Sequence, residues 1–302
     1  MNNSTNASTV ANQVSAGWYT FQVATACYFT AGTYIFAALL RYEAINGKFR
    51  GPYLTSRFLM KIIAMLSCLC LVSSTFTTQV SLLVSRGVFS HQLRVCELSL
   101  RIEAFVVSLG VTCTHAFLWF RQYVFYRQGR FRHMSNRLVA VLSSATIALV
   151  VLGFVAACVA FSLERSSMGL VGYGCTYKYM SEFLKSFLMC LDVFYILTIL
   201  VLFGLFVYPL VAGPAVTNDI STVSRDVNEV KYAIRVSIWS AATCTLSSLL
   251  RIVLGRSSVV RREALPSFYM SSACELTLLV SIVSMLLTYG EYKKILFGCC
   301  RS

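Results

Sequence analysis

Long apolar runs alternate with short polar connections along the 302 residues of this chain. Each run is long enough to cross a hydrocarbon core of about 30 Å as a helix, which takes about 20 residues. The predicted helices cover residues 17–41, 58–85, 94–124, 137–163, 182–211, 229–254 and 264–289. The sixth has a short uncharged stretch, which Arg235 and Arg251 close. The pattern predicts an all-α membrane protein built as a seven-transmembrane helix bundle.

The N-terminal residues indicate how such a bundle is oriented. Residues 1–16 are polar and carry N-x-Ser/Thr glycosylation sequons at Asn2, Asn3 and Asn6. Such sequons are used only in the lumen of the secretory pathway, so the N-terminus is expected outside the cell. Because seven is an odd number of crossings, the C-terminus is then expected in the cytosol.

Lysine and arginine residues favour the same orientation. With the N-terminus outside, the inner loops and the C-terminal tail hold more of these residues than the outer loops, as the positive-inside rule requires. The last outer loop, which contains Arg256 and Arg261, fits this rule least well. The predicted parts of the chain are a glycosylated extracellular tail over 1–16, the bundle over 17–289, and an amphipathic helix with a cytoplasmic tail over 290–302.

Composition narrows the class of protein and its partners. With 57% hydrophobic residues, 13% charged residues and a mean hydropathy of +0.69, the chain cannot cover a soluble fold with polar surface. The net charge of +14 comes from basic residues at the ends of the apolar runs. This distribution suits the anionic headgroups of membrane lipids and argues against nucleic acid as a partner.

Two pairs among the 12 cysteines differ from those inside the apolar runs. Cys96 lies at the outer start of the helix predicted over 94–124, and Cys175 lies in the next outer loop. Both face an oxidising compartment, so a disulfide between them is expected. Cys299 and Cys300 follow a short segment with basic and apolar faces, 291–297, and are predicted palmitoylation sites.

These features resemble the rhodopsin-like G-protein-coupled receptors, and the resemblance covers all seven predicted helices. That family joins a cysteine at the top of its third helix to one in the second outer loop, as Cys96 and Cys175 would be joined here. Arg121, within Phe120-Arg121-Gln122-Tyr123, has the spacing from Cys96 of the family's coupling arginine. Tyr289, the segment 291–297 and the two terminal cysteines also match the family in order and distance. The resemblance implies an extracellular ligand, a heterotrimeric G protein that contacts Arg121, and the plasma membrane as location.

The chain departs from the family's pattern at several positions. No acidic residue precedes Arg121, the second helix has no aspartate, and the first has no interior asparagine. The fourth helix lacks tryptophan and the sixth lacks proline, and Met285-Leu286-Leu287-Thr288-Tyr289 replaces the family's Asn-Pro-x-x-Tyr. These departures fit a divergent orphan receptor. They leave open whether the chain has basal activity or has lost coupling.

Three acidic residues within the apolar runs are the candidate ligand-binding residues. Glu103, Asp192 and Glu275 lie at similar depth in three different predicted helices. A carboxylate in lipid is costly unless it is paired or hydrated, so such a ring is expected to attract a cation, such as an amine or a divalent ion. The alternative is structural pairing with the basic residues at similar depth, Arg101, Lys185 and Arg251. Arg101 also has the i,i+4 spacing for a pair with Glu97 on its own helix.

Other chemistry is not indicated. The three histidines are too scattered for a catalytic zinc site, and no Gly-rich phosphate loop is present. The last predicted helix has no lysine, which excludes a retinal Schiff base there. We therefore expect a receptor without enzymatic activity, metal or cofactor. Two alternatives stay open: a receptor-like membrane protein that does not signal, and an ion channel or transporter that uses the acidic ring.

Overall fold

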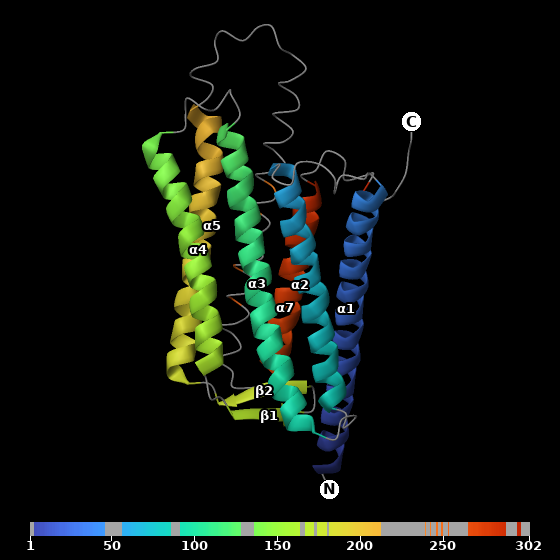
Figure 1. The fold of residues 1–302 in the computed structure, drawn as a ribbon. Coiled ribbons are helices and arrows are strands. Elements are labelled where there is room, and N and C mark those ends of the chain that lie inside the picture. Colours follow the sequence, from blue (N-terminus) through green and yellow to red (C-terminus); the bar gives the residue numbers. More distant parts are fainter. Residues whose placement is uncertain are drawn as a thin grey trace.

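The computed structural model describes residues 3–45, 56–85, 91–127, 136–163, 167–171, 174–179, 181–212, 265–287 and 295–296, with single positions between 239 and 253. Within these ranges the chain forms six helices and one two-stranded sheet. The helices are α1 (Asn3–Ile45), α2 (Ser56–Ser85), α3 (Gln92–Arg127), α4 (Arg137–Leu163), α5 (Glu182–Ala212) and α7 (Leu265–Leu287). The strands are β1 (Ser167–Val171) and β2 (Gly174–Tyr179). Figure 1 shows the helices side by side, with the strands at one end, which we call the hairpin end.

Five of the described helices are long and apolar enough to cross a membrane. Their candidate spans are Trp18–Ile45, Phe58–Val84, Gln92–Val124, Arg137–Leu163 and Glu182–Leu205, and the apolar stretch of α7, Ser271–Leu287, is shorter. Large apolar side chains on α4, such as Leu138 and Leu152, are more than 60% exposed. Such surface suits contact with lipid, so these helices indicate a membrane protein.

The observed helices follow the predicted ones closely, with one difference at the N-terminus. Helix α1 begins at Asn3, whereas the sequence predicted a tail up to residue 16. The helix can continue through this segment because it contains no proline or glycine. The predicted helix over 229–254 lies mostly outside the described residues. Its described positions have helical backbone and exposed side chains, at Trp239, Ala242, Leu246, Leu249 and Val253.

Helix α3 contacts α7 along a seam of regular spacing. Glu103 on α3 contacts Ser271 on α7, and Phe117 packs with Met285. Phe117 follows Glu103 on α3 by as many residues as Met285 follows Ser271 on α7. Because both contacts advance together along the chain, the two helices run in the same direction. Positions separated by seven residues lie on one side of a helix, so this seam occupies one face of each helix.

Helix α5 also runs parallel to α3. His115 on α3 contacts the carbonyl of Tyr195, and further along the Tyr126 hydroxyl donates to the Leu205 carbonyl at 2.7 Å. Helix α4 packs against both α3 and α5 and runs in the opposite direction (Figure 1). Helices α3, α5 and α7 therefore all begin at the hairpin end.

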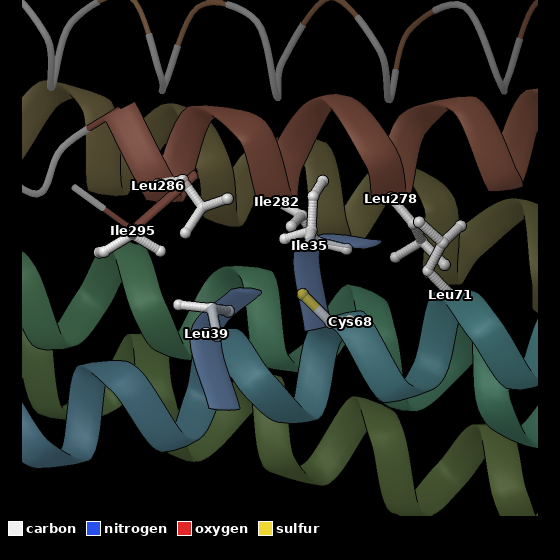
Figure 2. Packing of buried hydrophobic residues seen from close by; sticks show 8 residues of the cluster. All are labelled: Ile35, Leu39, Cys68, Leu71, Leu278, Ile282, Leu286 and Ile295. Atoms are coloured by element: carbon white, nitrogen blue, oxygen red, sulfur yellow. The ribbon is translucent and has the colours of Figure 1, made fainter. Parts of the chain in front are cut away.

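The principal apolar core joins α1, α2 and α7. Figure 2 shows its side chains pointing toward one another: Ile35, Leu39, Cys68, Leu71, Leu278, Ile282, Leu286 and Ile295. The residues from α7 recur every four positions, which places them on one face of that helix. Ile295 belongs to the segment predicted as an amphipathic helix, and its burial attaches this part of the chain to α1 and α7.

The two strands form an antiparallel hairpin that the sequence analysis did not predict. Leu170 pairs with Cys175, and Val171 pairs with Gly174. The Cys175 amide donates to the Ser81 hydroxyl on α2 at 3.0 Å. The hairpin is thus connected to the helices next to the first turns of α3.

Candidate functional site between helices α3 and α7

The expected disulfide is present and fixes the hairpin to α3. Cys96 and Cys175 are bonded, with their Cα atoms 5.4 Å apart, and both are buried. Cys96 lies in the first turns of α3, seven residues before Glu103. At the rise of an α-helix this separation is about 10 Å along the axis. The disulfide therefore stabilises the end of the bundle nearest to the acidic residues.

Glu103 makes the central polar contact of this region. The Ser271 hydroxyl donates to Glu103 Oε1 at 2.5 Å, across the interface between α3 and α7. The Ser271 hydroxyl also lies 3.2 Å from the Thr78 hydroxyl on α2. Three helices thus contribute one polar side chain each to a connected group.

Glu275 lies next to this group, one helical turn after Ser271. It is fully buried, and neither of its carboxylate oxygens has a hydrogen-bond partner in the described part of the chain. The Thr78 hydroxyl lies within reach of its carboxyl group, and the Glu103 carboxyl group is close enough to act on it electrostatically. The structure therefore brings two carboxyl groups together in a buried place.

The two hydroxyl groups, Ser271 and Thr78, provide fewer hydrogen-bond donors than the neighbouring carboxyl and carbonyl groups can accept. Each hydroxyl carries a single proton. Ser271 donates its proton to Glu103, and Thr78 is also within 3.0 Å of the Ser74 carbonyl, to which it donates. The two hydroxyls cannot serve both carboxyl groups as well as the backbone. Thr78, the hydroxyl within reach of Glu275, is shared with the Ser74 carbonyl and the Ser271 hydroxyl, so a ligand with N–H groups would meet an acceptor with unused capacity there.

Two of the three basic residues considered as structural partners pair with other acids. Arg101 pairs with Glu97 at 2.9 Å, as its spacing predicts, and Lys185 pairs with Glu182 at 2.6 Å. Arg251 lies outside the described residues. Among the residues that the structure describes, no lysine or arginine pairs with Glu103 or Glu275.

The third predicted acid lies on another helix. Asp192 lies half-buried on α5, and the described contacts of Glu103 and Glu275 involve α2, α3 and α7 instead. The structure therefore brings two of the three predicted acids together, the acidic pair Glu103 and Glu275, and the participation of Asp192 stays a prediction.

The opposite end of α3 carries the predicted coupling residue. Arg121 is half-buried there, beside a row of aromatic side chains. Trp119 and Tyr123 are stacked with ring centroids 5.4 Å apart, and the Trp119 indole donates to the Ser143 carbonyl on α4 at 2.8 Å. These contacts fix the last turns of α3 against α4. The role of Arg121 in G-protein coupling stays a prediction.

The remaining predicted sites fall at the edges of the described structure. Asn3 and Asn6 lie in the first turns of α1, whereas Asn2 is outside the described residues. Tyr289, Cys299 and Cys300 also lie outside them. Glycosylation and palmitoylation therefore stay predictions.

The hydroxyl residues of the site were not predicted from the sequence. Serines and threonines are abundant in the apolar runs, where they commonly serve helix packing. A local signal was present, because Ser271 precedes Glu275 by four residues and so shares its helix face. The contact of Ser271 with Glu103 depends on the register between α3 and α7, which no local pattern reveals.

Comparison of the chain with models of known protein families and with characterised proteins finds no match.

Proposed function

We propose that this chain is a G-protein-coupled receptor of the plasma membrane that binds a cationic extracellular ligand between α3 and α7. The observation that carries the proposal is Glu275, a fully buried carboxyl group without a hydrogen-bond partner among the described residues. A buried carboxylate is destabilising unless a cation or donor accompanies it. A protonated amine supplies both, since it brings a positive charge and several N–H donors.

The neighbouring groups define where such a ligand binds. Ser271 holds the Glu103 carboxyl group on the α7 side of α3, facing Glu275 one helical turn away. An ammonium group placed between the two carboxyl groups would donate to both at once. The Thr78 hydroxyl offers a further acceptor on α2. The ligand class that fits best is therefore a small molecule with a primary or secondary amine.

The arrangement of the helices supports the receptor reading. Helices α5 and α7 both run parallel to α3, which is compatible with one further crossing between them and hence with seven in total. Glu103 and Arg121 lie on the same helix, 18 residues or about 27 Å apart along its axis. Ligand contact and transducer contact would thus occur at opposite ends of α3, as in a receptor that spans the membrane.

In the proposed mechanism, the ligand changes the population of two states of the bundle. An ammonium group that binds Glu103 and Glu275 together favours the state in which α3 and α7 are closest at the hairpin end. A ligand shifts such an equilibrium only by its difference in affinity for the two states. The motion would reach the inner end through the packing of Phe117 against Met285.

The test is a screen of small protonated amines on cells that express the chain, with Gα dissociation as the readout. We expect a response that Glu103→Gln and Glu275→Gln each abolish, at equal surface expression. Glu97→Gln is the matched control, because Glu97 pairs with Arg101 at a half-exposed position and should leave the response unchanged. A response that survives both substitutions in the acidic pair would contradict the proposed site.

The same variants separate signalling from transport. The acidic pair also suits an ion path, which the sequence analysis kept as an alternative. Uptake or ionic current that Glu103→Gln abolishes, in the absence of Gα dissociation, would replace the receptor proposal with a transporter or channel.

A further inference from the structure

A groove of about 320 Å³ lies between α1 and α2, away from the acidic pair. Phe36 on α1 and Phe58, Met65 and Leu69 on α2 contribute to its apolar wall. Leu69 is 47% exposed, so the groove opens on the outer surface of the bundle, which lipid would cover. A membrane lipid is therefore the natural occupant of this groove.

One end of the groove is polar. Glu43 on α1 and Lys61 on α2 form an ion pair there, with side chains 4% and 17% exposed. The Lys61 ammonium also lies 5.4 Å from the centre of the Tyr42 ring. Beyond the ion pair, Glu43 Oε1 has no hydrogen-bond partner in the described part of the chain. The carboxylate therefore retains the capacity to accept a further hydrogen bond.

The charge of this polar end selects among lipids. Because Glu43 and Lys61 neutralise each other, the polar end has no net charge that would attract an anionic or a cationic headgroup. A neutral hydroxyl group needs no such charge, since it can donate to Glu43 and accept from Lys61. The polar end thus favours an uncharged lipid with a hydroxyl headgroup.

The length and lining of the groove select a rigid lipid body. Lys61 and Leu69 are eight residues apart on α2, or about 12 Å along its axis. A fused ring system fills such a groove without loss of rotamer freedom, whereas an acyl chain would lose conformational entropy on binding. We propose that this groove is a sterol-binding site, with the sterol hydroxyl at Glu43 and Lys61 and the rings along α2.

The test uses the full chain in phosphatidylcholine nanodiscs and a cholesterol analogue that carries a diazirine crosslinker. We expect labelling of peptides that cover residues 36–43 and 58–69, and displacement of the probe by unlabelled cholesterol. Leu66→Trp should block the groove, because Leu66 lines it. Leu149→Trp is the matched control, because it adds the same large side chain at an exposed position on α4, outside the groove. It should leave labelling unchanged.

A second variant tests the polar end. Glu43→Leu combined with Lys61→Met removes the ion pair without leaving a lone buried charge, so the fold should tolerate it. Probe labelling should fall about tenfold, since hydrogen bonds to charged groups contribute at least that factor. Labelling that neither variant reduces would overturn the proposal. Displacement of the probe by phosphatidylglycerol, but not by cholesterol, would overturn it in favour of an acyl-chain site.

Discussion

Gly110 on α3 lies against Leu278 on α7 so closely that a Cβ atom at Gly110 would be 2.7 Å from Leu278 Cδ2. This contact is the middle of a seam in which each helix contributes a residue every seven positions. From the hairpin end, Glu103 contacts Ser271, Gly110 contacts Leu278, and Phe117 packs with Met285. The seam therefore connects the acidic pair to the opposite half of the bundle.

The close approach at Gly110 predicts that this position rejects side chains. Gly110→Leu should destabilise the protein by about 1–3 kcal/mol, the usual cost of overpacking. Gly204→Leu on α5 is the matched control, because no atom lies within 4 Å of the position of its Cβ. Thermal unfolding in detergent measures both variants. Equal unfolding temperatures for the two would contradict the close packing of α3 and α7.

Removal of the disulfide should have a large effect. Cys96→Ser frees the hairpin from α3 and should cost about 2–5 kcal/mol of stability, as loss of a native disulfide commonly does. Cys175→Ser should have the same effect, and the double variant should add nothing further. Surface expression is the measurement, with Cys27→Ser as control because Cys27 is free and exposed. Normal surface levels of Cys96→Ser would show that the bond is dispensable.

Neutralisation of the buried acid should separate stability from function. Glu275→Gln removes a buried carboxylate without a hydrogen-bond partner in the described part of the chain. We expect the ligand-free protein to gain stability, because a neutral amide costs less to bury than a carboxylate. The same variant should lose the response to amines. A variant that is less stable than the parent would indicate that Glu275 is already paired in the resting protein.

Tyr126, beyond the apolar part of α3, should give a dependence on alkaline pH. Burial, together with nearby Tyr208, raises the pKa of Tyr126 from 10.0 to about 12. Because the folded state holds this proton more tightly than the unfolded state, the stabilisation is complete below pH 10 and is lost as the pH rises toward 12. Tyr126→Phe should lower stability at neutral pH, because it removes the hydrogen bond to the Leu205 carbonyl. The difference in unfolding temperature between parent and variant should shrink above pH 10, and a constant difference would contradict this assignment.

The sequence was sufficient for most of the helices and for the disulfide. The helix predicted over 137–163 is observed as Arg137–Leu163, because one long apolar run defines both of its ends. The start of α1 was wrong, because hydropathy marks where the membrane begins rather than where the helix begins. The hairpin was missed because its strands are short and contain glycines, and only their contacts with α2 and α3 make them regular.

The site was predicted only in part for a different reason. Glu103 and Glu275 were recognisable as acids within apolar runs. Their proximity to each other and the participation of Ser271 depend on how the helices are rotated against one another. The ion pair of Glu43 and Lys61 likewise joins residues from different helices. Such relationships follow from packing between elements, which a local sequence pattern does not encode.

The most direct test of the receptor proposal is ligand-independent Gα dissociation in cells that express the chain, across the main Gα classes. Arg121→Ala is compared with the parent at equal surface level, in the absence and then in the presence of the amine panel. We expect dissociation in at least one class, and its loss in Arg121→Ala. Silence in every class with and without amines, at full surface expression, would contradict it and favour a membrane protein that does not signal.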